Sequence, residues 1–413
     1  MRWKTMLALL CAFLTLAQGC LAFSDTVATL DQADALTLTV GGLEIRQITG
    51  TENGRRVLNA FLSPLSAKVA VNADAAYLAI LSAGQEAASV QLGPDLWPDT
   101  KTLPHMLLNR FFSETLPALF DACMPAEEPP EPELRNVNVR NLPRSTQRTT
   151  LTVTPAQLAA SPAVAQIREC VAQLSAHLAQ ADEITAWAEN LEAVSNLTVK
   201  RLENDAGEPV AWNVTGNISS GGKDVRKMTL YGGMDGMNAY VSLKLPARSG
   251  KNNFELVIDL KAKTGKKKNT WAGTISFKRV MNGVSCTITD TVDLENEHTS
   301  GEQISGSVKR QLTEGGIKTV WTVKPVLASD GHGFQGTLKV TKKHAQTQVW
   351  ELAVALSVRE GAEAGTATAE GLSEFAAQLA EYLADYRSKL EPGDQRQLDH
   401  MLRTDAWMNG PLQ

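Results

Sequence analysis

Apolar and polar residues alternate along most of the chain between residues 196 and 358, and each alternating run stops at a Gly, Asn, Asp or Lys. A period of two residues is typical of a strand with one apolar and one polar face. About ten such runs, separated by turns roughly every 10 to 15 residues, predict an antiparallel meander. Four tryptophans lie in phase with the apolar positions: Trp212, Trp271, Trp321 and Trp350.

The region before the meander, residues 25–195, mixes strand and helix patterns. Residues 76–92 predict a hairpin, and residues 102–124 have the periodicity of an amphipathic helix. Residues 124–141 contain four prolines and four glutamates. That composition buries little apolar surface, so it predicts a solvated, partly extended loop.

Helix starts are marked in front of the meander, and helices are expected again after it. Thr154 before Pro155 and Ser161 before Pro162 each place a hydroxyl at the N-cap and a proline at the first helical position. Residues 359–413 follow the meander as a linker of small residues and two helices that end the chain.

These patterns predict an α+β fold, in which a large curled antiparallel β-meander has its apolar face covered by helices. The curl is expected because adjacent strands twist by about 20 to 25°. A curled sheet with helices on its concave side resembles the half-barrel of bacterial lipoprotein carriers and of related lipid-binding envelope lipoproteins. The resemblance covers the architecture of residues 196–358 with their flanking helices. It involves no family motif and assigns no functional residue.

Residues 1–24 resemble a signal peptide rather than a part of the fold. Arg2 and Lys4 precede an apolar stretch of about a dozen residues, which is too short to span a bilayer as a helix. A competing interpretation is a lipobox that ends at Cys20 and lipidates it, although Ala17 departs from the usual branched residue. Either interpretation predicts an exported bacterial protein, secreted or held at the cell envelope, with no membrane-spanning segment after processing.

Charge is unevenly distributed along the chain, whose formal net charge is -5. Residues 197–358 contain 22 basic and 15 acidic residues, so the remainder is clearly acidic. The basic excess in the meander is too small to predict nucleic-acid binding. We therefore expect no nucleic-acid partner.

Lysines crowd the end of one expected hairpin in the meander. In one interpretation, the positive charge of these lysines prevents a long strand end from pairing with another sheet. In the other, the cluster contacts an anionic surface such as phospholipid headgroups, where each lysine adds about 1 kcal/mol. The residues concerned are Lys261, Lys263, Lys266, Lys267 and Lys268.

Two cysteines are candidates for a disulfide. Cys123 and Cys170 both lie near segments with a helical pattern, and disulfides are common in exported proteins. Two separate buried thiols are the alternative.

No local grouping of residues predicts catalysis. The six histidines are scattered, and none has the spacing of a metal site. Nucleophile-elbow, phosphate-loop and dinucleotide motifs are missing from the sequence. Asp290, Asp293, Glu295 and Glu297 crowd one strand, but we interpret them as a solvated hairpin end rather than a glycosidase pair. We expect no enzyme activity, no metal and no cofactor.

The apolar face with its tryptophans has two interpretations. It lines a site for a lipid or another apolar ligand, or it is ordinary core beneath the helices. Four tryptophans bury roughly 150 to 250 Å² each, which is more area than one helix easily covers. The first interpretation predicts a non-catalytic ligand-binding protein of the bacterial envelope, and the second a structural or interaction scaffold. A secreted hydrolase is a third and weaker hypothesis.

Overall fold

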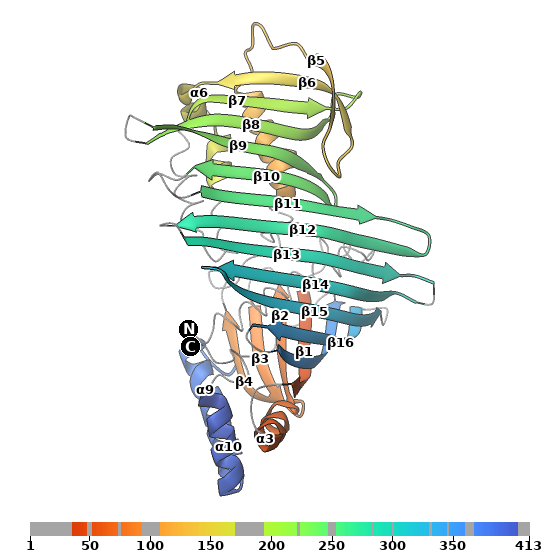
Figure 1. Ribbon diagram of the computed structural model, residues 1–413, viewed down its shortest axis with the longest axis vertical. Helices are drawn as coiled ribbons and strands as arrows, with labels where there is room; N and C mark the ends of the chain where they lie inside the picture. The colour runs from red at the N-terminus through yellow and green to blue at the C-terminus, as the bar shows by residue number, and fades with distance from the viewer. Residues whose placement is uncertain are drawn as a thin grey trace.

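A computed structural model gives the fold of most of the chain. Antiparallel β-sheet dominates it (Figure 1). Residues 1–24 with Cys20, and also Cys170, lie outside the residues it describes. The described residues are 35–47, 52–72, 76–92, 108–169, 194–220, 224–246, 253–281, 284–299, 301–329, 333–344, 347–359 and 367–403.

Seventeen strands belong to one sheet. Their bounds are β1 (Ala35–Gln47), β2 (Leu65–Asn72), β3 (Ala76–Ser82), β4 (Gln85–Leu92), β5 (Glu133–Asn138), β6 (Arg144–Val153), β7 (Val194–Glu203), β8 (Pro209–Ser220), β9 (Asp224–Asp235), β10 (Asn238–Pro246), β11 (Asn253–Lys263), β12 (Lys268–Met281), β13 (Val284–Glu297), β14 (Gln303–Glu314), β15 (Ile317–Ser329), β16 (Gly333–Lys343) and β17 (Thr347–Arg359).

The strands β5 to β17 form one antiparallel meander, in which each strand pairs with the strand before it in the sequence. The strands β1 to β4 form a second meander, and β1 lies between β2 and β17. β4 and β5 follow one another in sequence but lie at opposite ends of the sheet (Figure 1). The sheet is open, because no ladder within the described residues joins β4 to β5.

The sheet extends beyond residues 196–358, the range that the alternation predicted. Strand β6 pairs with β7, so the expected boundary near residue 195 falls inside the sheet. At the other end, Ala35 of β1 stands opposite Arg359 of β17. Local alternation cannot show such a pairing, because the two strands are separated by almost the whole chain.

Residues 124–141 are not entirely a loop, as their composition predicted, because they contain β5. This strand is short and lies at the edge of the sheet, where it pairs only with β6 in the described part of the chain. An edge strand tolerates charged residues, since one of its sides needs no ladder partner. The prediction was therefore wrong for residues 133–138.

Two local predictions are confirmed. Residues 76–92 form the hairpin of β3 and β4. Thr154 caps the helix α6 (Pro155–Ala160): its Oγ1 accepts a hydrogen bond from the Gln157 backbone N–H at 3.3 Å. The Gln157 side chain accepts one in return from the Thr154 N–H at 2.9 Å. Such a reciprocal box stabilises the first turn of a helix.

Burial alternates along the strands and separates two faces of the sheet. On β13, Val292, Leu294 and Asn296 are buried, whereas Thr291 and Asp293 on either side of Val292 are exposed. We call the first face the apolar face and the opposite one the polar face. One cross-strand row shows how far the apolar face continues: Leu151, Val199, Val214, Leu230, Leu243, Leu256, Phe277 and Ile288.

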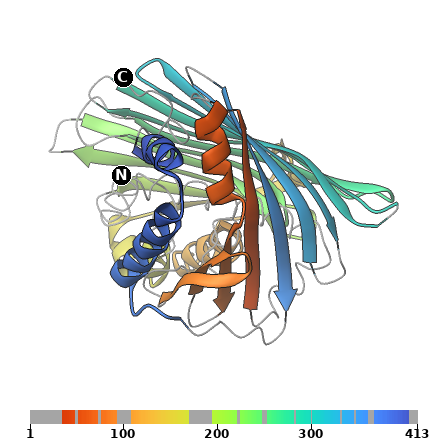
Figure 2. The same cartoon turned by 90° about the horizontal axis from the view of Figure 1, so that it is seen from below.

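The sheet bends along its length, so β2–β4 run in a different direction from β10–β14 (Figures 1 and 2). Glycines on the apolar face contribute to the curl. Gly273 has a φ of +152°, and a Cβ there would lie 1.9 Å from the carbonyl oxygen of Asp259. Only glycine accepts that backbone conformation and that close approach of the neighbouring strand.

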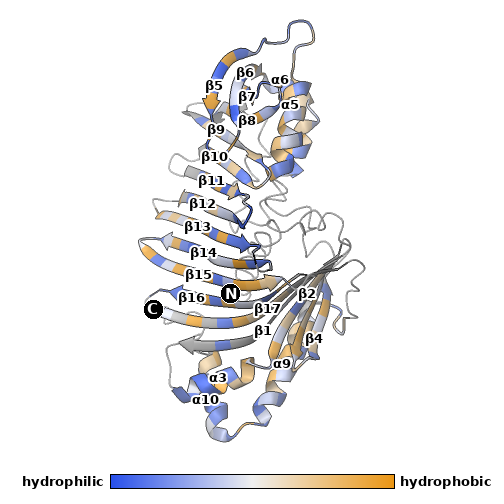
Figure 3. Cartoon of the chain, turned by 90° about the vertical axis from the view of Figure 1, so that its right-hand side faces the viewer, coloured by the Kyte–Doolittle hydropathy of each residue, from blue (hydrophilic) through white to orange (hydrophobic). Residues whose placement is uncertain are grey.

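The described helices lie toward the two ends of the sheet (Figure 3). One group consists of the π-helical turn η2 (Phe111–Thr115), α5 (Leu116–Ala122) and α6. The other consists of α3 (Glu52–Leu62), α9 (Leu372–Ser388) and α10 (Pro392–Arg403). Their contacts with the sheet concentrate on β7 and β8 at one end and on β1 and β4 at the other. The prediction that helices cover the whole apolar face is therefore not confirmed.

Candidate functional site

The predicted tryptophans can be placed on the sheet through its register. Trp212 and Trp321 share one cross-strand row on the apolar face, and Trp271 lies on the same face of β12. Trp212 and Trp271 are 1% and 5% exposed, and Trp321 is half-buried. Trp350 pairs with Val340 in the ladder, but its side chain lies outside the described part of the structure.

The row through Trp212 and Trp321 becomes polar where it crosses β13 to β16. Asp290, Arg310, Trp321 and Lys342 stand directly opposite one another on these successive strands. Arg310 donates two hydrogen bonds of 2.7 Å to the Asp290 carboxylate. The Lys342 Nζ lies 5.9 Å from the centre of the Trp321 ring, within cation–π range. We call these four residues the polar band.

Lys342 is unusual among the lysines of the sheet because it is only 7% exposed. Burial lowers its pKa below the ordinary value of a lysine, since a low dielectric disfavours the charged ammonium. The polar band therefore places ionisable groups among the apolar residues of this face. Such a face can contact both ends of an amphiphilic molecule.

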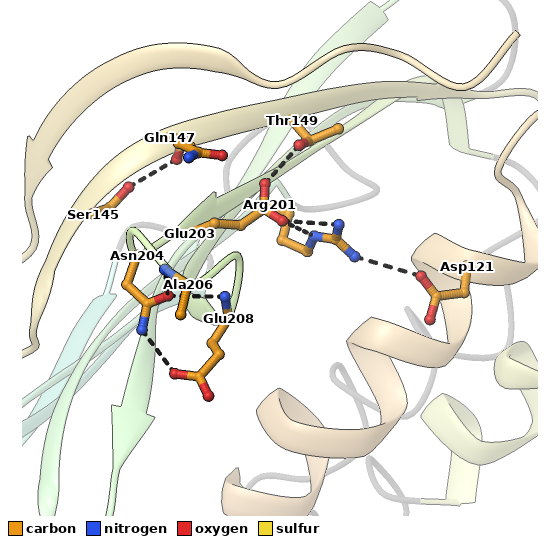
Figure 4. Close-up of polar contacts among 9 residues, drawn as sticks. All are labelled: Asp121, Ser145, Gln147, Thr149, Arg201, Glu203, Asn204, Ala206 and Glu208. Atoms are coloured by element: carbon orange, nitrogen blue, oxygen red, sulfur yellow. Dashed lines mark hydrogen bonds and ion pairs between the residues drawn. The ribbon is translucent and has the colours of Figure 1, made fainter.

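A second polar cluster, centred on Glu203, joins the helix α5 to the apolar face (Figure 4). Glu203 is 3% exposed, and its Oε2 accepts a hydrogen bond of 2.6 Å from the Thr149 hydroxyl. Its Oε1 accepts one of 2.9 Å from Arg201. The Arg201 guanidinium also lies 4.5 Å from the Phe120 ring centre and 3.5 Å from the Asp121 carboxylate. Phe120 in turn packs edge-on against Trp212.

The Glu203 cluster connects three elements of the structure. Both Glu203 oxygens accept hydrogen bonds, one from Thr149 of β6 and one from Arg201 of β7, and Arg201 in turn contacts α5. Among the other contacts in Figure 4, those of Asn204 are local turn bonds: its Oδ1 accepts from the backbone N–H groups of Ala206 and Glu208. They close the turn between β7 and β8.

A third cluster joins the C-terminal helices to the edge strand β4. The buried Ser89 hydroxyl accepts a hydrogen bond of 3.0 Å from the Thr368 N–H and donates one to the Glu86 carboxylate. Glu86 also accepts one of 2.5 Å from the Tyr77 hydroxyl. The Ala369 N–H donates to the Ser89 carbonyl oxygen at 2.9 Å, forming an isolated parallel bridge along β4. We call this set the Ser89 clasp.

Two opposing effects act on the Glu86 carboxyl in the clasp. Burial alone would raise its pKa, but hydrogen bonds from Ser89, Tyr77 and Thr368 and the charge of Lys68 lower it below the ordinary value. Burial raises the pKa of Tyr77, and its hydrogen bond to Glu86 and the Glu86 charge raise it further, against a lowering by Ser89. The charged form of Glu86 therefore holds the clasp together.

Beyond the clasp, α9 lies on the apolar face of β3 and β4. Phe375 of α9 is buried against Ala88 and Val90, and the Tyr382 hydroxyl lies 2.8 Å from that of Ser82. The Phe61 ring of α3 contacts Tyr386 at a centroid distance of 4.9 Å. The helices α3, α9 and α10 thus form a compact cover at this end of the sheet.

The predicted lysine cluster lies at the tip of the β11–β12 hairpin, and all five lysines are exposed. Lys268 forms a 2.7 Å ion pair with Glu295, which raises the pKa of Lys268. Lys261 of β11 and Asp293 of β13 stand in the same cross-strand row, with Ala272 of β12 between them. Carboxylates thus lie among the lysines of this hairpin.

The predicted acidic group is divided between the two faces. Asp290 lies on the apolar face with Arg310, whereas Asp293, Glu295 and Glu297 lie on the polar face. Asp290 therefore cannot face these three carboxyls across a common cleft, because successive strand residues point to opposite sides.

Cys123 is a buried thiol whose pKa is raised by burial, and Cys170, the partner considered for it in a disulfide, lies outside the described residues. Among the residues that the structure describes, no cluster of His, Cys, Asp and Glu is arranged to hold a metal ion. None of the described helices is both long and apolar enough to cross a membrane.

Comparisons with known proteins give no relatives. No family model matches the chain, and neither a curated protein nor a solved structure is significantly similar to it.

Sequence reasoning missed the polar band, the Glu203 cluster and the Ser89 clasp. The sequence does contain a signal for the first two. Charged residues occupy strand positions at which the alternation calls for apolar ones: Arg201, Glu203, Asp290, Arg310 and Lys342. The Ser89 clasp leaves no such signal, since its partners come together only through the fold.

Proposed function

We propose that this protein is a non-catalytic binding protein that holds an amphiphilic molecule, such as a lipid, against the apolar face of its sheet. The observation that carries the proposal is the extent of this face. It runs through consecutive strands, while the described helices contact mainly its two ends. A long apolar face flanked by helices at its ends suits an elongated acyl chain.

The polar band favours an amphiphilic ligand over a purely apolar one. Asp290, Arg310 and Lys342 lie at one level of the apolar face, between β13 and β16. A polar end of the ligand at that level avoids the cost of burying polar groups against hydrocarbon. Export to the bacterial envelope belongs to the same proposal, and residues 1–24 support it by their resemblance to a signal peptide.

Photo-cross-linking tests this proposal directly. A fatty acid that carries a diazirine near its chain end is added to the full protein, irradiated, and the modified residues are mapped by peptide mass spectrometry. We expect labels on apolar-face residues of β12 to β16, such as Ile275 and Trp321. Labels concentrated on polar-face residues, such as Val320 and Val326 of β15, would count against the proposal.

The scaffold without a ligand is the alternative, and one observation favours it. Val292, Leu294 and Leu338 in the middle of the apolar face are buried in the chain itself. If the protein is such a scaffold, cross-linking does not saturate at any residue. Added unlabelled fatty acid then leaves the yield of labelled peptide unchanged.

A further inference from the structure

The polar face of β14, β15 and β16 bears an unusual set of side chains. Its residues are Lys, Thr, Ser, Gln, Val and Ala, and none of them is Asp or Glu. All of the lysines are exposed, and none has an ion-pair partner among the described residues. We call this set the lysine patch: Lys309, Lys318, Lys324, Lys339 and Lys343.

The patch differs from the rest of the sheet in how its charges are paired. Elsewhere, two lysines form ion pairs with a glutamate on the neighbouring strand: Lys244 lies 3.0 Å from Glu255, and Lys268 lies 2.7 Å from Glu295. In the patch, Lys324 stands directly opposite Lys339, and like charges in that position destabilise a strand pair. On its other side Lys339 stands opposite Glu351 of β17, so an acidic residue borders the patch there. Positive charge is therefore concentrated on β14, β15 and β16.

Protection of a sheet edge does not explain the patch. Lysines often blunt an edge strand and prevent it from pairing with another sheet. However, β14, β15 and β16 are each paired on both sides. Their polar face is exposed, but their edges are not.

We propose that the lysine patch is a docking surface for an anionic phospholipid bilayer. A bilayer requires only positive charge close to its surface, and lysines on three adjacent strands supply it. Val326, 50% exposed within the patch, adds apolar area that a headgroup region accepts. Nucleic-acid sites instead rely on arginine forks and stacked aromatic rings, and the patch contains neither. The proposal is independent of ligand binding at the opposite face.

Vesicle binding by the full protein tests the proposal. Sedimentation is compared between vesicles of phosphatidylcholine alone and vesicles that also contain phosphatidylglycerol. We expect binding to the anionic vesicles only, and its loss in 1 M salt, where the Debye length falls to about 3 Å. Binding to both kinds of vesicle, or binding that resists salt, overturns the proposal.

Two double variants with the same change in net charge locate the site. Lys324→Gln with Lys339→Gln is expected to lower the affinity for anionic vesicles by about 30-fold. Lys266→Gln with Lys267→Gln, at the tip of the β11–β12 hairpin, is the matched control and is expected to bind as the unmodified protein does. If both double variants lose affinity for anionic vesicles equally, or if only the control loses it, the binding site is not the lysine patch.

Two further measurements distinguish the expected loss of vesicle binding from a loss of folding, and binding to a membrane from binding to another polyanion. The patch variant should unfold at the same urea concentration as the unmodified protein, because Lys324 and Lys339 are exposed and exposed substitutions change stability little. A lower midpoint would assign the loss of vesicle binding to a loss of folding and overturn the assignment to the patch. Tighter binding to duplex DNA than to anionic vesicles at equal salt would show a nucleic-acid surface instead.

Discussion

Charged residues in apolar phase have a definite structural role in this sheet. Arg201 and Glu203 continue the alternate positions of β7 that Leu197 and Val199 occupy, so an ordinary strand pattern would place apolar residues there. The structure pairs them with each other and uses the pair to hold Phe120 and Asp121 of α5. Burying a charge is tolerable only when hydrogen bonds and an opposite charge compensate it.

The Glu203 cluster predicts a large loss of stability on truncation. Glu203→Ala leaves the Arg201 guanidinium and the Thr149 hydroxyl without their acceptor in a buried site. We expect the free energy of unfolding to fall by about 3 kcal/mol, as for other broken buried ion pairs. Urea denaturation followed by circular dichroism measures it.

The matched control lies five residues away. Glu208 is exposed and bonds the Asn204 side chain at 2.8 Å in the turn between β7 and β8. Glu208→Ala should change the unfolding free energy by less than about 0.5 kcal/mol, as exposed substitutions usually do. If Glu203→Ala and Glu208→Ala lower the free energy of unfolding equally, the Glu203 cluster does not stabilise the packing of α5 on the sheet.

At the scale of elements, local signals predicted local structure. The β3–β4 hairpin and the cap of α6 at Thr154 follow from neighbouring residues, and both are confirmed. The alternation also predicted the meander, because its strands pair in sequence order. The position of β1 between β2 and β17 was not predictable in this way. That pairing depends on residues from opposite ends of the chain, and no local pattern records it.

The candidate site was predictable only in part, for a related reason. The phase of Trp212, Trp271 and Trp321 predicted their common face, since phase is a local property. The polar band depends on the register between neighbouring strands, which the alternation does not give, so Arg310, Trp321 and Lys342 could not be placed opposite one another from the sequence. Helix placement over the sheet was likewise unpredictable, because amphipathic helices fit any apolar surface.

The Ser89 clasp makes the attachment of α9 sensitive to acid. The pKa of Glu86 in the folded protein lies below its ordinary value of 4.5. Its stabilising effect is therefore complete above that pH and is lost as the pH falls through the lowered value. We expect hydrogen exchange in α9, corrected for intrinsic rates, to be constant between pH 7 and about 5 and to quicken at lower pH.

Two variants check the clasp. Glu86→Gln should give faster exchange in α9 at neutral pH and remove most of the acid dependence, while α3 is little affected. Ser388→Ala, which removes an exposed local bond to the Asp385 carbonyl oxygen, serves as the control and should exchange normally. Exchange in α9 that is the same in Glu86→Gln and in the unmodified protein would show that the clasp does not hold the helix.

At the scale of the whole molecule, the pairing of β1 with β17 joins the two meanders into one sheet. It also brings the N-terminal strands to the end of the sheet where α9 and α10 pack. Ladders between such distant segments form slowly in folding, because a long loop must close first. The β1–β17 ladder is therefore the interaction on which the continuity of the apolar face depends.

A pair of cysteines tests this ladder. Thr39 stands opposite Ala355, and directly opposite residues in an antiparallel pair have the Cα spacing that a disulfide needs. Thr39→Cys with Ala355→Cys should cross-link on mild oxidation, seen as a shift on a non-reducing gel. Thr39→Cys with Ala353→Cys is the control and should cross-link far less, because Ala353 lies on the same face as Ala355 but two residues away from it along β17. Equal cross-linking of the two pairs would mean that the register is wrong.

The proposal that the apolar face holds an amphiphile is tested most directly by native mass spectrometry of protein purified without denaturant. We predict a mass above that of the mature chain, with the excess removed by organic extraction and restored when a fatty acid or phospholipid is added. The same measurement on Trp321→Arg, which places a bulky charge in the polar band, should show weaker retention. Recovery of the bare chain alone, with no uptake of added lipid, would contradict the proposal and leave a scaffold.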